Sequence, residues 1–153
     1  MGKTSEEAKF HSFQGVGQMY TIPIGVNDAF MNISTRGFVG LDDGVMIGGV
    51  IITGTDPAKL LFRAIGPSLA GDGIQNPLLD PTLDLFDAQG TSLATNDNWK
   101  EAEQDAIAAT GLAPTNELEA ALLVDVNPGS VTAVVRGADG TTGVALVEVY
   151  HLP

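Results

Sequence analysis

The stretch VTAVVRGADGTTGVALVEVY, residues 131–150, carries the pattern that decides the fold. In its second half, VALVEVY, the odd-numbered positions are all apolar, whereas the even-numbered positions include Glu148 and Tyr150. An alternation with a period of two is typical of a β-strand that packs one face inward. The tripeptide Ala138-Asp139-Gly140 separates this run from the preceding one, and an Asp-Gly pair favours a turn. The stretch therefore predicts two β-strands joined by a short connection.

The same arrangement extends outward over most of the chain. From residue 18 onward, β-type runs follow one another, separated by short sequences rich in Gly, Asp, Asn and Pro. The expected turns are DDG (42–44), GTDP (54–57), DAQG (87–90), NPG (127–129) and ADG (138–140). The run VMIGGVIITG (45–54) is apolar on both faces, which predicts a central strand covered on both sides, with a bulge or close approach at Gly48-Gly49. Together the runs predict an all-β fold, an antiparallel, jelly-roll-like β-sandwich.

One segment departs from this pattern. Between residues 99 and 110, apolar residues recur at helical spacing, beginning with Trp99. Asn98 stands where its side chain can cap the first turn, Glu101 occupies the return position of a capping box, and Gly111 supplies a left-handed terminator. The sequence therefore predicts one short inserted α-helix over residues 99–110, anchored by a buried Trp99.

Length and composition limit the class of protein. The chain has 153 residues, which fits one β-sandwich domain at 29–153 preceded by a polar leader at 1–28 that could act as an exchanged strand. Its formal net charge is -12, so we expect no binding to nucleic acid or to anionic membrane surfaces. No apolar run is long enough to predict membrane insertion, and the lack of cysteine excludes disulfides and thiolate metal sites. The start, MGKTSEEAKF, lacks the apolar core of a signal peptide, so an extracellular location would require that a signal had been removed.

Acidic and amide residues gather around Trp99, in NDNWKEAEQD (96–105). Counted from Asn96, an EF-hand loop would need Gly at the sixth position and Glu at the twelfth, where the chain has Glu101 and Ile107. A discontinuous Ca²⁺ site remains open, because oxygen ligands flank the ends of two neighbouring expected strands. Its candidate ligands are Asp84, Asp87, Asn96 and Asp97, with Asn98 beside them. The competing interpretation is a capped helix whose first turn favours acids.

Catalytic motifs are weak. The sequence GPSLA (66–70) lacks the second Gly of a nucleophile elbow. His11 and His151 stand near opposite ends of the sequence, so we do not expect them to complete a Ser-His-acid triad or a zinc site. We therefore expect that the protein is not an enzyme, and Ca²⁺ is the only cofactor that the sequence suggests.

The three arginines share a position in the pattern. Arg36, Arg63 and Arg136 each stand near the end of a β-type run, shortly before a Gly. They could form an anion-binding row. They could instead hold strand ends by pairing with carboxylates such as Asp84, Glu148 or Asp28, and the number of acids favours this structural interpretation.

Several segments, in order, resemble a known module. They are MNISTRGFVG (31–40), GVMIGGVIITGTDPAKLLFRAIGPSLA (44–70), NPLLDPTLDLFDAQGTSLATNDNW (76–99), AIAATGLAP (106–114) and VTAVVRGADGTTGVALVEVY (131–150). The chain resembles a β-rich module of large secreted proteins of environmental bacteria, and the part from DPTL to VVRG is similar to the bacterial pre-peptidase C-terminal domain. The resemblance implies an extracellular, non-catalytic β-sandwich used for attachment or assembly, with acidic loops that can bind Ca²⁺.

Two functions follow as hypotheses. The first is a structural protein of the cell surface that associates with copies of itself, as an oligomer or a filament. The leader could add a strand to the sheet edge of a neighbour, and the expected assembly residues are Phe10, Phe13, Met19, Tyr20 and Ile22. The alternative is a Ca²⁺-dependent adhesion module that binds a protein or a carbohydrate.

Overall fold

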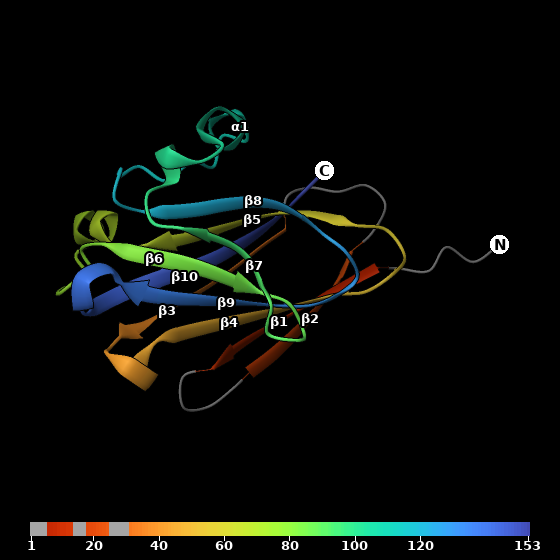
Figure 1. The fold of residues 1–153 in the computed structure, drawn as a ribbon, viewed down its shortest axis with the longest axis horizontal. Helices are drawn as coiled ribbons and strands as arrows, with labels where there is room; N and C mark the ends of the chain where they lie inside the picture. Colours follow the sequence, from red (N-terminus) through yellow and green to blue (C-terminus); the bar gives the residue numbers. More distant parts are fainter. Residues whose placement is uncertain (1–5, 14–17, 25–30) are drawn as a thin grey trace.

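The computed structural model describes residues 6–13, 18–24 and 31–153, with side chains from residue 32 onward. The described residues form two antiparallel sheets (Figure 1). The strands are β1 (Glu6–Phe13), β2 (Gln18–Ile24), β3 (Met31–Val39), β4 (Met46–Ile52), β5 (Ala58–Ile65), β6 (Pro81–Phe86), β7 (Ser92–Asn96), β8 (Ala120–Val126), β9 (Gly129–Gly137) and β10 (Gly143–Leu152). The larger sheet has the order β2-β1-β4-β9-β6-β7, and the smaller has the order β3-β10-β5-β8. The predicted all-β antiparallel sandwich is confirmed.

Strand pairing is nested around a single turn. β6 pairs with β7 across the turn at residues 87–91, and outside this pair β5 pairs with β8, β4 with β9 and β3 with β10. The chain is thus one long hairpin folded over on itself. Apart from the β6–β7 hairpin, every connection between β3 and β10 passes from one sheet to the other. This is the eight-stranded jelly roll, as the sequence predicted.

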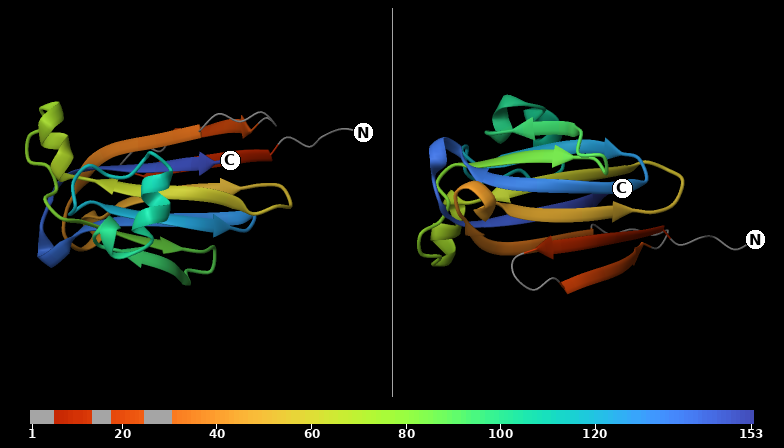
Figure 2. Two further views of the ribbon diagram at one scale, coloured as in Figure 1. Left: turned by 90° about the horizontal axis from the view of Figure 1, so that it is seen from above. Right: turned by 60° about the horizontal axis from the view of Figure 1, so that its bottom comes forward.

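The N-terminal hairpin is an addition to this roll. β1 pairs with β4, from Ala8 opposite Ile52 to Phe13 opposite Ile47, and β2 pairs with the other side of β1. Figure 2 shows the hairpin on the side of the sandwich opposite the helical segment that follows β7. The eight strands from β3 to β10 complete both layers of the roll without it.

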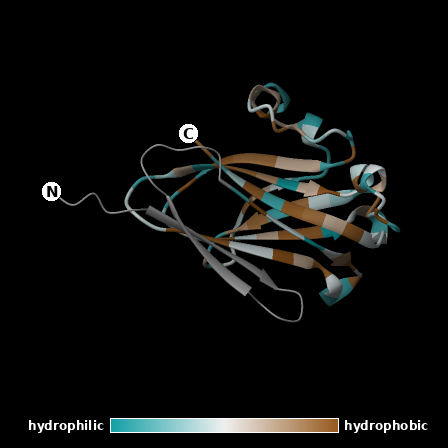
Figure 3. Cartoon of the chain, turned by 180° about the vertical axis from the view of Figure 1, so that it is seen from behind, coloured by the Kyte–Doolittle hydropathy of each residue, from teal (hydrophilic) through white to brown (hydrophobic). Residues whose placement is uncertain are grey.

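The core lies between the sheets and follows the predicted alternation. In β6, Leu83 and Leu85 are buried, and in β10 the residues 145, 147 and 149 are buried. Each fully buried aliphatic side chain of this kind stabilises the fold by about 1.5–3 kcal/mol. Figure 3 shows apolar residues concentrated on the strands and polar residues in the turns.

A second, smaller core covers the outer face of the four-stranded sheet. It consists of Leu61, Trp99, Ile107, Ala121, Tyr150 and Leu152. The segment that follows β7 supplies Trp99 and Ile107, and it lies above β8 in Figure 1. The predicted burial of Trp99 is confirmed.

The single helix predicted over residues 99–110 is divided in two. A 3₁₀ turn, η3 (Trp99–Glu101), precedes the α-helix α1 (Gln104–Ala109). Between them Ala102 is extended and Glu103 is left-handed, with φ 47° and ψ 31°. The backbone N–H of Trp99 donates to the carbonyl of Glu119 (2.9 Å), and its indole N–H donates to the carbonyl of Asn116 (3.2 Å). These tertiary bonds hold the turn at Trp99, and the helix restarts only where Ile107 can reach the sheet.

The remaining connections between strands contain further 3₁₀ helices. Three further 3₁₀ helices are η1 (Asp42–Gly44), η2 (Pro67–Asp72) and η4 (Ala138–Gly140). The pairing of β4 with its neighbours runs without a shift through Gly48 and Gly49, so the bulge expected there is absent. The outer face of β4 is also less covered than predicted, because Ile47 is 36% exposed. None of the helices in the described ranges has the length and apolar character needed to cross a membrane.

Candidate functional site

The residues predicted to bind Ca²⁺ lie on different faces of the larger sheet. Asp84 stands opposite Thr95 on the outer face, and its carboxylate accepts from the Thr95 hydroxyl (2.6 Å) and from Nη1 of Arg136 (2.7 Å). Asn96 stands opposite Leu83, and like Leu83 it is buried. Neighbouring positions on a strand point to opposite faces, so Asp84 and Asn96 cannot share one ligand sphere.

The other two predicted ligands are also placed separately. Oδ1 of Asp87 accepts from the backbone N–H of Gln89 (2.9 Å) and of Thr91 (2.8 Å), and in this way it closes the β6–β7 turn. Asp97 is exposed, just after β7. Among the residues with described side chains, no three His, Asp or Glu lie close enough to hold a metal. The structure therefore does not bring the predicted ligands together.

Asn96 instead joins the two sheets, because it links β7, an edge strand of the larger sheet, to β8, an edge strand of the smaller sheet. Its Oδ1 accepts from the backbone N–H of Ala121 at the start of β8 (3.0 Å), and its Nδ2 donates to the carbonyl of Asn98 (3.0 Å). The cap predicted for Asn98 is not formed, because its side chain bonds no helix amide. Its Nδ2 donates to the carboxylate of Glu101 instead (3.2 Å).

Asp80 lies in surroundings that disfavour its ionised form. Burial, followed by the negative charges of Asp97 and Asp139, raises the pKa of Asp80 above its usual value. Its Oδ1 is buried and has no hydrogen-bond partner among the described residues. This cluster was not predictable from the sequence, because the three acids are far apart along the chain.

Two of the three arginines form the ion pairs that the structural interpretation predicted. Arg63 pairs with Glu148 across β5 and β10, and Arg136 pairs with Asp84 across β9 and β6. Arg63 also donates to the Leu112 carbonyl (2.6 Å) and the Tyr150 hydroxyl (3.1 Å). Desolvation raises the pKa of the Tyr150 hydroxyl, although the charge of Arg63 opposes the shift. Arg36 lies on the exposed outer face of β3, and Asp28, the third carboxylate suggested for the arginines, lies outside the described residues.

The sequence GPSLA forms a structural anchor. Its Ser68 lies at the start of η2, and both the N–H and the hydroxyl of Ser68 donate to Oε1 of Glu119, as does the N–H of Gly66 (3.2 Å). Glu119 is fully buried (0% exposed), and its Oε2 accepts from the N–H of Asn116 (3.3 Å). The hydroxyl of Ser68 is thus bound to a carboxylate that backbone amides also hold. Sequence reasoning missed Glu119, because an acid before an apolar run is usually read as exposed.

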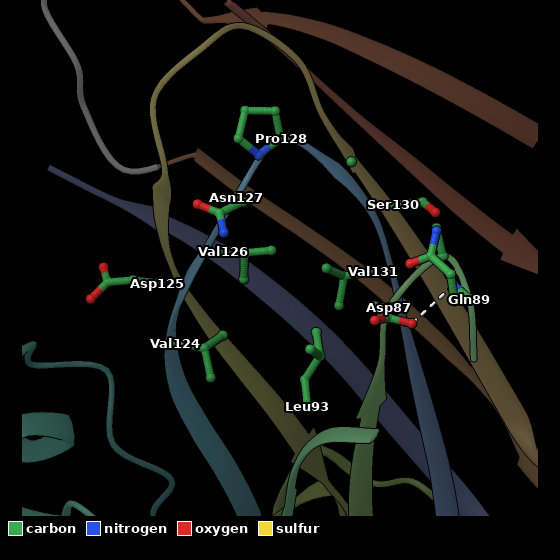
Figure 4. A pocket seen from close by; sticks show the side chains of 12 residues that line it. Asp87, Gln89, Leu93, Val124, Asp125, Val126, Asn127, Pro128, Ser130 and Val131 are labelled. Atoms are coloured by element: carbon green, nitrogen blue, oxygen red, sulfur yellow. Dashed lines mark hydrogen bonds between the residues drawn. The ribbon is translucent and has the colours of Figure 1, made fainter. Parts of the chain in front are cut away.

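A pocket of about 500 Å³ opens between residues of the two sheets. It is lined by the β6–β7 turn, the end of β8 and the start of β9. Figure 4 shows Leu93, Val124, Val126 and Val131 pointing toward one another across this space, while Asp125 points away. Apolar walls with a polar rim are typical of a binding pocket.

A β-bulge gives this pocket an exposed apolar wall. Leu85 stands opposite Ala94 and Phe86 stands opposite Ser92, which leaves Leu93 as an extra residue in β7. A bulge redirects the side chain at which it occurs, and Leu93 is 46% exposed beside the pocket. Nothing in the sequence marks this bulge, because SLAT resembles an ordinary strand.

The predicted assembly residues fall in the N-terminal hairpin. Phe10 and Phe13 are in β1, and Met19, Tyr20 and Ile22 are in β2. The structure describes the backbone of these positions, and their side chains lie outside the described residues. What the structure shows of these residues is therefore their place in the hairpin, whose strand β1 pairs with β4.

The chain matches no model of a known protein family and no curated protein sequence.

Proposed function

We propose that this protein is a non-catalytic structural β-sandwich that associates with copies of itself by exchanging its N-terminal hairpin. The observation that carries the proposal is the pairing of β1 with β4, at an edge of an otherwise complete jelly roll. An edge strand presents unpaired backbone groups that another strand can bind. The same edge of β4 would accept the hairpin of a neighbouring copy.

Exchange requires no new contact. The hairpin forms the same backbone hydrogen bonds whether β4 belongs to its own chain or to another, so little free energy separates the two arrangements. Mutual exchange would close into a dimer, whereas one-way exchange from copy to copy would extend into a filament. An extracellular location, as the resemblance implies, is part of this proposal.

The chemistry of the described residues supports a non-catalytic role. The carboxylate of Glu119, which binds the Ser68 hydroxyl, is already held by backbone amides. His151 lies in β10, opposite Met31 and Leu60. A nucleophile needs a base within hydrogen-bond reach, and Ser68 has an acceptor that is committed to structure.

Two single-cysteine variants would test exchange directly, because the natural chain has no cysteine. Lys9 in β1 stands opposite Ile51 in β4. Lys9→Cys and Ile51→Cys proteins, unfolded together, refolded and oxidised, should form a mixed disulfide dimer. The matched control pairs Lys9→Cys with Ile47→Cys, which is on the same strand but out of register. Equal yields from the two mixtures would show random collision and would contradict exchange.

A deletion tests whether assembly depends on the hairpin. Removing residues 1–24 deletes β1 and β2 and leaves all eight strands of the roll. Light scattering should then show a folded monomer, whereas the full chain should show a larger mass at the same concentration. An unchanged mass after the deletion would rule out the hairpin as the basis of assembly.

The Ca²⁺-dependent alternative stays a prediction with its own measurement. A ligand present at about a hundred times its dissociation constant stabilises a fold by about 2.7 kcal/mol. Thermal melting in Ca²⁺ and in chelator measures this effect, and identical melting temperatures would remove the alternative.

A further inference from the structure

The backbone groups on the edge of β8 that faces away from β5 are hydrogen-bonded only at the beginning of the strand, among the bonds of the described residues. At its beginning, the outward-facing backbone is already bonded: the carbonyl of Glu119 accepts from Trp99, and the N–H of Ala121 donates to the side chain of Asn96. Alternate residues of an antiparallel strand direct their backbone groups to the same side. Leu123 and Asp125 therefore direct theirs to this edge too, where the described sheet ends at β8.

The pocket lies beside this second half of β8. Val124 and Val126 share the inner face of the strand and line the pocket, with Leu93 on the opposite wall. A strand added to this edge would direct alternate side chains to the inner face, beside Val124 and Val126. The side chains between them would lie on the outer face, beside Asp125.

The other side of β8 shows which side chains suit these positions. On β5, Ala58 stands opposite Val126, Lys59 opposite Asp125 and Leu60 opposite Val124. This neighbour of β8 thus alternates apolar, basic and apolar residues. The residues that line the pocket include Asp87 and Asp125 and no Lys or Arg. A basic residue is therefore favoured beside Asp125 by charge.

We propose that the edge of β8 from Leu123 to Asn127 binds an extended segment of a separate protein, in which a Lys or Arg lies between two aliphatic residues. The peptide backbone pairs with Leu123 and Asp125, one aliphatic side chain enters the pocket between Leu93 and Val126, and the basic residue lies beside Asp125. Backbone bonds supply affinity and the pocket supplies specificity, as in other cases of strand addition. This site is independent of the hairpin exchange proposed above, which uses β4.

Hydrogen exchange measured by NMR on the full chain tests the pairing. The probe is a blocked six-residue peptide that contains valine, lysine and valine in succession. Adding it should slow the exchange of the Leu123 and Asp125 amides at least tenfold and leave the Val124 amide, which faces β5, unchanged. Unaltered exchange at Leu123 and Asp125 at millimolar peptide would overturn the proposal.

Variants test the pocket and the charge separately. Leu93→Asp should weaken peptide binding at least tenfold, whereas Leu118→Asp, at a residue that is also 46% exposed but outside the pocket, should not. A peptide with glutamate in place of lysine should bind the natural protein at least fivefold more weakly, and Asp125→Asn should remove this difference. Equal binding by the two Leu variants, or by the two peptides on the natural protein, would contradict the assignment.

A last control identifies the occupant. If the Leu123 and Asp125 amides become protected when the protein alone is concentrated, a second copy occupies the edge, and the proposal of a separate partner is wrong. Protection that appears only with peptide supports it.

Discussion

Nε of Arg63 lies 2.8 Å from Oε2 of Glu148, between two strands whose register places these residues directly opposite each other. Both side chains are largely buried under the segment that follows β7, which contributes the Leu112 carbonyl to the same guanidinium. The pair therefore joins the sheet to the layer that covers it.

Breaking this pair should destabilise the protein strongly. Glu148→Leu leaves the charge of Arg63 buried without its carboxylate, which costs about 3–5 kcal/mol. The double variant Arg63→Met/Glu148→Leu should lose less than Glu148→Leu alone, because no unpaired charge remains. Urea unfolding measures both. The control is Arg136→Met, which breaks a more exposed pair and should cost at most about 1 kcal/mol.

Removal of Glu119 should release the start of η2. Glu119→Ala leaves the buried amide of Gly66 and the part-buried amide of Ser68 without an acceptor, and a buried unsatisfied group costs about 1–3 kcal/mol. Glu117→Ala is the matched control, because Glu117 is exposed and bonds only Lys100 among the described residues. Similar urea midpoints for the two variants would show that the hydrogen bonds of Glu119 contribute little.

Gly66 has a steric requirement that Gly71 lacks. A Cβ on Gly66 would lie 2.0 Å from the carbonyl oxygen of Leu78, whereas a Cβ on Gly71 would meet nothing within 4 Å. Gly66→Ala should therefore destabilise the fold by at least about 2 kcal/mol. Gly71→Ala should leave stability unchanged or raise it by up to about 1 kcal/mol. Thermal melting of both variants would check the contrast, and a Gly66→Ala protein as stable as the natural one would contradict it.

The raised pKa of Asp80 predicts a stability that depends on pH. Its folded-state pKa lies above the unfolded value, so its contribution is fully present below the unfolded pKa and is lost as pH rises through the folded pKa. At pH 7 the ionised Asp80 is unfavourable beside Asp97 and Asp139. Asp80→Asn should raise stability at pH 7, by less than about 1 kcal/mol because the site is partly exposed, and should have less effect at pH 3.

A second substitution identifies the source of that effect. Asp97→Asn should also stabilise at pH 7, but it should do less when Asp80 is already Asn, because the repulsion between the two charges is then gone. Denaturant unfolding of the two single variants and the double variant measures this coupling. Strictly additive effects would show that Asp97 does not act on Asp80.

The layered β-fold was predictable because its signals are local. Alternation in VALVEVY assigns the inner face of β10, and the turn residues at 87–90 mark the centre of the roll. Two ion pairs were also foreseeable, because arginines at strand ends had few other roles in so acidic a chain. The break at Glu103 was not predictable, because it depends on bonds from Trp99 to residues near β8.

The candidate site was harder to predict, because it depends on which strands become neighbours. Asp84 and Asn96 look like joint ligands in sequence, but pairing of β6 with β7 places them on opposite faces. Leu93 looks like an ordinary strand residue, and only the register shift in the same pair exposes it beside β8. No local pattern contains that information.

The nesting of the strands also determines when the fold can close. Strands β6 and β7 are near neighbours in the chain, but β3 must wait for β10, which is made after the other described strands. Pairing between distant segments is slow, because the loop they close must be ordered first. Until β10 is made, the apolar inner face of β3 lacks its strand partner, and a newly made chain is exposed to aggregation. We therefore expect pulse-labelling hydrogen exchange during refolding to protect β6 and β7 before β3 and β10, and the reverse order would contradict a closure that proceeds outward from the central turn.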